Sequence, residues 1–92
     1  MFFSKDKNIN KKINNKINNF KNELSYYDLN LKDYLNNCKI NSITLELGDT
    51  ISYKDNNGFV FCGVSRDCLL EFFSISENKF YFLKPEDILF IF

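Results

Sequence analysis

The strongest constraint on the fold lies in the second half of the chain, from Gly48 to Phe92, where short apolar runs alternate with turn residues. Ile, Val, Phe and Tyr, which favour strands, dominate these runs. So many short strands in so short a segment can bury their apolar faces only by curling into a small closed barrel. We therefore expect a mainly β fold. Its five predicted strands are Asp49–Tyr53, Phe59–Val64, Leu69–Ile75, Phe80–Leu83 and Ile88–Phe92.

The residues between these runs predict how the strands are connected. The run Lys54–Gly58 predicts a tight hairpin, because its Asn-Gly pair tolerates the positive φ that such a turn needs. Gly63 lies inside a predicted strand, which indicates a sharp barrel corner or a close approach of another segment to its backbone. Lys84–Asp87 contains the single Pro of the chain and has room for one helical turn.

The first part of the chain has the periodicity of a helix. From Lys7 to Leu24 apolar residues recur at intervals of three and four, which places them on one stripe. The many Asn residues between them are poor helix formers, so this helix needs a surface to pack on. That surface is the chain's own barrel, a neighbouring protein or RNA. The stripe consists of Ile9, Ile13, Ile17, Phe20 and Leu24.

A second, shorter helix is predicted within Ser25–Asn37, with Asp28 or Asn30 as its N-cap. The alternation that follows, over residues 43–47, predicts a half-buried strand in which Ile43, Leu45 and Leu47 face the core. The chain therefore divides into a basic helical arm at residues 1–24 and a barrel domain at 25–92 that begins with the short helix.

Charge is distributed unevenly, although the formal net charge is zero. Residues 1–22 contain six Lys and a single acidic residue, Asp6, whereas residues 23–92 are acidic overall. A basic arm before an acidic body indicates that the arm approaches polyanions first. The lysines either neutralise phosphates or form a solvated face, and we favour phosphate contact because they accompany an apolar stripe.

Nothing in the sequence predicts catalysis or a cofactor. The chain has no His, and a structural zinc site normally requires four Cys or His ligands, so we expect no metal. We expect Cys62 and Cys68 to be small core residues in a reducing compartment. Ser65-Arg66-Asp67 has no neighbouring base, and Glu86-Asp87 is expected to be solvated or capping. No apolar run approaches the length needed to span a bilayer.

Aromatic residues are abundant, with eleven Phe and five Tyr. Alternate residues on a strand face opposite ways, so the aromatic runs of the barrel place some rings outside. An outward aromatic surface indicates a covering partner. We predict that Phe59, Phe72 and Tyr81 contact a neighbouring protein.

Several strand sequences together resemble the bacterial-type large-subunit ribosomal protein nineteen family. Leu47-Gly48-Asp49-Thr50-Ile51 is similar to the Pro-Gly-Asp-Thr-Val that opens the family's barrel, and Phe61-Cys62-Gly63-Val64 resembles its Phe-Glu-Gly-Val strand. Glu71–Ile75 and Lys79–Leu83 are similar to its Glu-Thr-Phe-Thr-Val and Arg-Ile-Phe-Pro-Leu strands, and Ile88 and Ile91 fall where it has Ile-x-x-Ile. The resemblance covers roughly residues 47–92.

The resemblance implies an SH3-like five-stranded barrel that binds ribosomal RNA of the large subunit and touches neighbouring ribosomal proteins, as a single copy rather than a homo-oligomer. The low Arg content and AT-rich codon bias suit a divergent mitochondrial member in the matrix; the alternative location is the cytoplasm of an AT-rich bacterium or its phage. The predicted RNA-binding residues are Lys5, Lys7, Lys11, Lys12, Lys16, Lys21, Lys54, Arg66, Lys79 and Lys84.

Three other functions fit the same pattern. A helix followed by five strands also suits an Sm-like RNA-binding ring subunit, which would form a symmetric oligomer. A small-barrel ribonuclease would need an Arg in a groove, and Arg66 is the single candidate. A phage-encoded inhibitor of a bacterial defence system is the third alternative, because such proteins are short and depend on partners.

Overall fold

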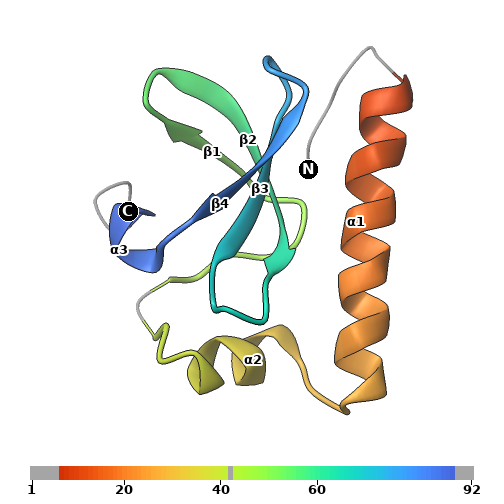
Figure 1. The fold of residues 1–92 in the computed structure, drawn as a ribbon, viewed down its shortest axis with the longest axis vertical. Coiled ribbons are helices and arrows are strands. Elements are labelled where there is room, and N and C mark those ends of the chain that lie inside the picture. Colours follow the sequence, from red (N-terminus) through yellow and green to blue (C-terminus); the bar gives the residue numbers. More distant parts are fainter. Residues whose placement is uncertain (1–6, 42, 89–92) are drawn as a thin grey trace.

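The computed structural model describes residues 7–41 and 43–88, and Figure 1 shows their arrangement. Two helices precede a four-stranded antiparallel sheet, and one helical turn follows it. The helix bounds are α1 Lys7–Tyr26, α2 Leu31–Asn37 and α3 Pro85–Ile88, and the strands are β1 Thr50–Tyr53, β2 Asn56–Val64, β3 Leu70–Ser74 and β4 Lys79–Leu83. The predicted helices, the single turn after β4 and four predicted strands are thus confirmed, with small shifts in their ends.

The sheet is an open meander, with strand order β1-β2-β3-β4. Its registers pair Ile51 with Phe59 and Phe72 with both Phe61 and Tyr81. The predicted closure into a barrel is not seen in the described part of the chain, where β1 and β4 each have one neighbour. The predicted fifth strand begins at Ile88, which instead ends α3, and its other residues, 89–92, lie outside the described ranges.

Helix α1 packs lengthwise beside the sheet (Figure 1). Its predicted apolar stripe is fully buried, from Ile9 to Leu24. The N-terminal part of the stripe packs with Val60 and Phe73 of the sheet in one cluster. Of the three surfaces left open by the sequence, α1 uses the chain's own sheet. This contact explains how a helix rich in Asn forms, since burying an amphipathic face offsets poor intrinsic propensity.

The opposite face of the sheet carries the larger core. Phe61 and Phe72 are completely buried there, together with apolar residues from α2, from the segment after it and from α3. Asn30 is the N-cap of α2, and it forms a capping box with Asp33. The predicted strand at 43–47 is wrong as a hydrogen-bonded element, but its alternating burial is seen as predicted. Those covering residues are Leu35, Ile40, Ile43, Leu45 and Ile88.

The first hairpin turns three residues before the Asn-Gly pair on which the prediction rested. Lys54 and Asp55 form the loop with φ of 47° and 64°, and Tyr53 pairs with Asn56 across it. The Asn57-Gly58 pair lies instead within β2. The Asn56 amide explains this choice, because it donates to Ser74 Oγ and Ser76 Oγ, each at 2.9 Å, and its oxygen accepts from the Gly58 N–H at 3.1 Å.

Gly63 is a point of close approach, as predicted. A Cβ atom added at Gly63 would lie 2.8 Å from Cγ of Phe20 on α1.

We expect Gly63→Ala to lower the free energy of unfolding by about 1–3 kcal/mol, the usual cost of overpacking a core. Urea unfolding measures the change. In a Phe20→Ala background the added cost is expected to shrink, because the ring atoms that meet the new Cβ are gone; an unchanged cost would contradict the contact.

The cysteines are arranged differently from the prediction. Cys38, the C-cap of α2, and Cys68, in the β2–β3 loop, form a disulfide with a Cα–Cα distance of 5.5 Å. The expectation that Cys68 is a free core residue is therefore wrong. The sequence could not reveal the pair, because the two residues are 30 positions apart and meet only when α2 packs below that loop. Cys62 is free and fully buried, as predicted.

Candidate nucleic-acid interface

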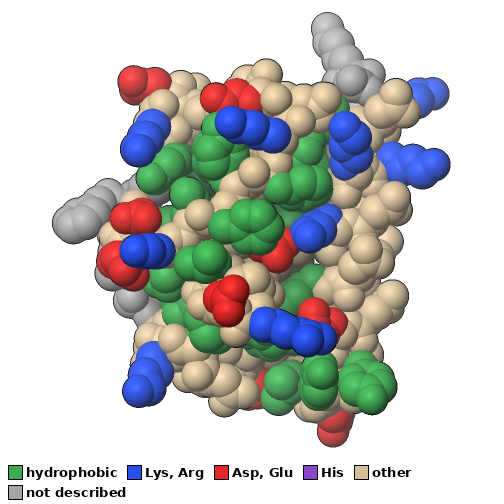
Figure 2. Space-filling view, in the orientation of Figure 1, with side chains coloured by type: hydrophobic (Ala, Val, Ile, Leu, Met, Phe, Trp, Pro, Cys, Tyr) green, Lys and Arg blue, Asp and Glu red, His purple; other side chains and the backbone are tan. Residues whose placement is uncertain are grey.

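Lysines from three elements gather at one end of the molecule. Figure 1 places the start of α1 and the turns of the β1–β2 and β3–β4 hairpins at this end, and Figure 2 shows several basic side chains over the N-terminal half of α1. Lys12 Nζ donates to Asn78 Oδ1 at 3.3 Å, which joins α1 to the β3–β4 turn. We call this surface the basic end. Its members are Lys7, Lys11 and Lys12 from α1, Lys54 from the β1–β2 turn and Lys79 from β4, all exposed.

The solvent face of α1 continues the basic end along the helix. Helical spacing places this face beside the buried stripe, and its residues are exposed. Asn14, Asn18 and Lys21 also line a groove that contains carboxylates of the segment before β1. The first acidic residue of the helix is Glu23, so the preceding turns present only amides and ammonium groups. Such groups donate hydrogen bonds to phosphate oxygens. The members of this face are Lys7, Lys11, Asn14, Asn18 and Lys21.

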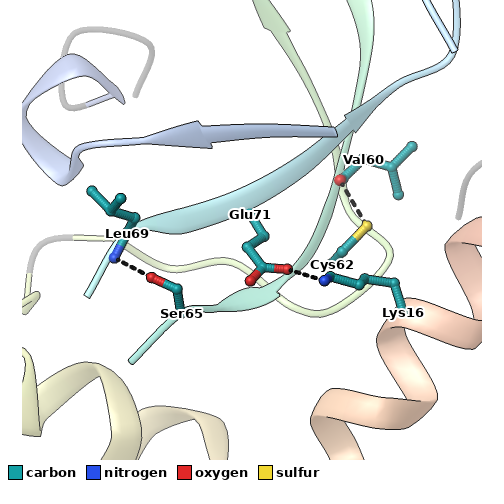
Figure 3. A network of polar contacts seen from close by, with 6 residues as sticks. All are labelled: Lys16, Val60, Cys62, Ser65, Leu69 and Glu71. Carbon is teal, nitrogen blue, oxygen red and sulfur yellow. Dashed lines mark hydrogen bonds and ion pairs between the residues drawn. The ribbon is translucent and has the colours of Figure 1, made fainter. Parts of the chain in front are cut away.

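Two other predicted RNA-binding residues are held in ion pairs. Lys16 reaches from α1 to Glu71 on β3, with Nζ 3.2 Å from Oε2 (Figure 3). Its Nζ also lies 5.4 Å from the centre of the Phe80 ring. Arg66 Nε lies 3.8 Å from a carboxylate oxygen of Glu23, at the other end of α1. These cations are partly neutralised within the chain and lie away from the basic end.

The remaining predicted cations are not members of the basic end, although Lys21 belongs to the face of α1 that continues it. Lys21 borders a groove that contains the carboxylates Glu46 and Asp49. Lys84 is exposed just before α3 and its two acidic residues. Lys5 lies outside the described residues. The structure therefore brings together only part of the predicted set.

The aromatic prediction is wrong for two of its three residues. Phe59 and Phe72 are 3% and 0% exposed, so neither ring is available to another protein. Tyr81 is half-buried. The reason is that α1 covers one face of the sheet and the segment around α2 covers the other, so both strand faces are largely internal. Among the residues that the structure describes, the most exposed large apolar side chains are Tyr26, Tyr27 and Phe82.

Three of the predicted residues, Lys54, Phe59 and Tyr81, line one cavity at the basic end, and Lys79 lies over the Tyr81 ring. The cavity, about 310 Å³, lies between the β1–β2 and β3–β4 hairpins. Phe59 stacks on Tyr81 with ring centres 5.2 Å apart and is tilted against Tyr53 at 5.5 Å. Lys54 Nζ lies 5.4 Å above Tyr53, and Lys79 Nζ lies 4.8 Å above Tyr81. We call this the aromatic cavity; its lining residues are Tyr53, Lys54, Asn56, Phe59, Glu77, Tyr81 and Leu83.

Sequence reasoning missed Tyr53 and Glu77 of the aromatic cavity. The Tyr81 hydroxyl donates a hydrogen bond to the carboxylate of Glu77, which lies four residues earlier in the β3–β4 turn. Tyr81 and then Glu77 raise the pKa of Lys79, which keeps its ammonium charged. The sequence does show Tyr53 at the end of β1 and Glu77 in the β3–β4 turn. It does not show that they lie close together, because this depends on the curvature of the sheet.

Among the described residues, neither the free cysteine nor the acidic side chains form a reactive centre or a metal site. Burial, and then the nearby Glu71 carboxylate, raise the pKa of the Cys62 thiol to about 12, so at neutral pH this thiol is not a nucleophile. Within residues 7–41 and 43–88 no group of three His, Cys, Asp or Glu side chains is placed to hold a metal ion. In the same ranges no helix is long and apolar enough to cross a membrane.

The basic end and the aromatic cavity thus form the strongest candidate site, with donors for phosphate beside exposed ring surface. Comparison with models of protein families, with curated proteins and with solved structures finds no match to this chain.

Proposed function

We propose that this chain is a non-catalytic RNA-binding protein that grips the phosphate backbone with its basic end. The observation that carries the proposal is the convergence of Lys7, Lys11, Lys12, Lys54 and Lys79 from three separate elements. Solvated lysines scattered for solubility have no reason to collect at one end of a chain whose net charge is zero. Phosphate contacts of this kind supply affinity and position without reading sequence.

The rest of the surface supports a defined orientation toward a polyanion. Two carboxylates, Asp55 and Glu77, lie among the lysines of the basic end, and most others lie away from it, on the helix termini, the β2–β3 loop and α3. A molecule with one basic end and one acidic end turns its basic end toward RNA as it approaches, and salt weakens this steering. The acidic residues concerned are Glu23, Asp28, Asp33, Asp67, Glu86 and Asp87.

The assembly we propose is the large ribosomal subunit, in which the chain is a single-copy structural constituent. The similarity of residues 47–92 to ribosomal protein nineteen supports this choice, and the proposal includes the five-stranded SH3-like barrel of that family. The free edge of β1 in the described residues is compatible with one more strand. Phe82, 52% exposed on β4, is the surface we assign to a neighbouring ribosomal protein.

The disulfide bears on where such an assembly would be. Disulfides are rare in the cytosol, where thiol systems keep cysteines reduced. A ribosomal location in the mitochondrial matrix, or in a bacterial cytoplasm, therefore requires that the chain folds with Cys38 and Cys68 reduced. Trapping free thiols rapidly in intact cells tests this part of the proposal, and a fully oxidised pair would argue for a more oxidising compartment.

Salt-dependent binding is the direct test of the basic end. Single-stranded RNA labelled with a fluorophore is titrated with the full chain, and anisotropy is recorded over roughly 50–200 mM salt. Each phosphate contact to a single strand contributes about 0.7 to the slope of log K against log salt. Replacing Lys11 and Lys54 by Gln is expected to flatten that slope by about 1.4 and to weaken binding at low salt.

Lys32 and Lys39 provide the matched control, because both are exposed and lie near α2, away from the basic end. Replacing this pair by Gln removes the same net charge, and the salt slope is expected to stay close to the wild-type value. Equal effects of the two double substitutions would show that net charge alone drives binding. Failure of the tagged chain to co-sediment with large ribosomal particles in high salt would reject the ribosomal assignment.

A further inference from the structure

We infer that the aromatic cavity holds a single unstacked nucleobase of bound RNA, while the lysines beside it bind the adjacent phosphates. This inference rests on the proposed RNA binding and adds to it a base-recognition site. The combination that carries it is a cavity lined by aromatic rings and by Lys54, with the Lys79 ammonium over the ring of Tyr81, one of its lining residues. Single-stranded nucleic acids are bound by this pairing of aromatic platforms with basic grooves.

The walls of the cavity are suited to a flat ring. Phe59 is 3% exposed and forms a fixed floor, while Tyr53 and Tyr81 are half-buried on either side of it. The ring centres of both tyrosines lie between 5 and 6 Å from that of Phe59. At about 310 Å³ the space is at the small end of ligand pockets, which matches one ring system rather than a folded ligand.

The cavity wall is also held in place. The Asn56 amide bridges β2 to the end of β3 through Ser74 and Ser76, and Ser74 is fully buried. Tyr81 is fixed by its hydrogen bond to Glu77. Because these groups are already ordered, little conformational freedom is lost when a ligand enters.

Lys54 and Lys79 can exchange places with a bound base. In the free chain each ammonium rests over a tyrosine ring, Lys54 over Tyr53 and Lys79 over Tyr81. An exposed cation–π contact is weaker than stacking of a base on the same ring. We expect a base to take the place of an ammonium, which then moves to the neighbouring phosphate. After this exchange the tyrosine ring stacks on the base and the ammonium pairs with the phosphate, so the ring and the ammonium each keep a favourable contact.

Charge favours a nucleotide over the other ligand class that aromatic pockets bind. Methylated ammonium groups are recognised by rings arranged as a cage. Here two lysines of the chain already lie against the rings, and they repel a second cation. The same lysines attract a phosphate on either side of a base.

Glu77 gives the site a preference among bases. Its carboxylate lines the aromatic cavity and has acceptor capacity beyond the bond from Tyr81. A carboxylate accepts from the amino group of cytosine, whereas uracil has a carbonyl at the same position. We therefore expect cytosine to bind more tightly than uracil, and Glu77→Gln to reduce the difference.

The decisive measurement compares two hexamers of equal charge on the full chain by isothermal titration calorimetry. One is a cytidylate RNA hexamer, and the other is an abasic ribose-phosphate hexamer. We expect the cytidylate to bind about tenfold more tightly. Tyr53→Leu and Tyr81→Leu are each expected to remove most of that advantage, measured within each variant as the ratio of its affinities for the two hexamers. Tyr26→Leu, an exposed tyrosine at the far end of α1, is the matched control and keeps the advantage.

The outcomes separate the inference from the function on which it depends. Equal affinity of the wild-type chain for both hexamers, with a clear salt dependence, overturns the base site and leaves phosphate binding standing. No binding of either hexamer overturns both. Binding of a trimethyllysine peptide that is lost in Tyr53→Leu overturns the base site in favour of a cation cage. Circular dichroism of each variant checks that it is folded, and the wild-type comparison needs no variant.

Discussion

Replacing Cys38 and Cys68 together by Ser is expected to lower the free energy of unfolding by about 3–4 kcal/mol. The disulfide joins residues 30 positions apart. A crosslink of that span restricts the unfolded chain, and the loop-entropy model places its effect between about 3 kcal/mol for a 15-residue loop and about 4.7 kcal/mol for a 100-residue loop. For a small domain this is a large fraction of total stability. Guanidinium unfolding of the oxidised wild type and the double variant measures the difference.

A reductant supplies the control for this prediction. Reduced wild-type protein is expected to be about as stable as the double Ser variant, and the variant is expected to be insensitive to the reductant. If the reduced wild type unfolds at the same denaturant concentration as the oxidised form, the crosslink does not stabilise the chain. The experiment also decides whether the protein can remain folded in the reducing compartments that a ribosomal role implies.

Ile13→Ala is expected to lower the free energy of unfolding by a comparable amount, in the upper part of the roughly 2–5 kcal/mol range for Ile→Ala in a core. Ile13 is completely buried between α1 and the sheet, in the cluster that contains Val60 and Phe73. The change leaves a cavity at the centre of the contact that holds the helix. Because α1 has weak intrinsic helicity, we also expect α1 to be the first element of this variant to unfold on heating, seen as an early loss of helical circular dichroism.

Asn15 provides the matched control on the same helix. It lies on the exposed side of α1, two positions from Ile13. Asn15→Ala is expected to be neutral or to stabilise the chain by up to about 0.7 kcal/mol, because Ala is the better helix former. Urea unfolding followed by circular dichroism at 222 nm, the standard helix band, gives both values. Similar losses in the two variants would mean that α1 is not docked through its apolar stripe.

Much of the local structure could be predicted from residue patterns. The spacing of Ile9, Ile13 and Ile17 predicted α1, and Asn30 was one of two N-caps foreseen for α2. Gly63 was predicted to be a point of close approach, and the contact with Phe20 confirms it. These predictions depend on neighbours along the chain, where periodicity and capping chemistry act directly.

The candidate site could be predicted only in part. Basic residues were identified one by one, but nothing in their order indicated that Lys11, Lys54 and Lys79 belong to one end while Lys16 and Arg66 pair with carboxylates elsewhere. The burial of Phe59 was also hidden, because a strand sequence does not reveal whether its second face is covered. Because α1 covers one face of the sheet and the segment around α2 covers the other, aromatic side chains that were predicted to be exposed lie in the core.

The sequence by itself determined the elements: an amphipathic first helix, a capped second helix, short apolar strands and a proline-initiated turn. Only the tertiary structure decided which elements meet. The docking of α1 on the sheet, the pairing of Cys38 with Cys68 and the assembly of the aromatic cavity all join residues far apart in the chain. Local patterns are set by interactions within a few residues, whereas these contacts depend on the curl of the sheet and on the packing that its covered faces impose.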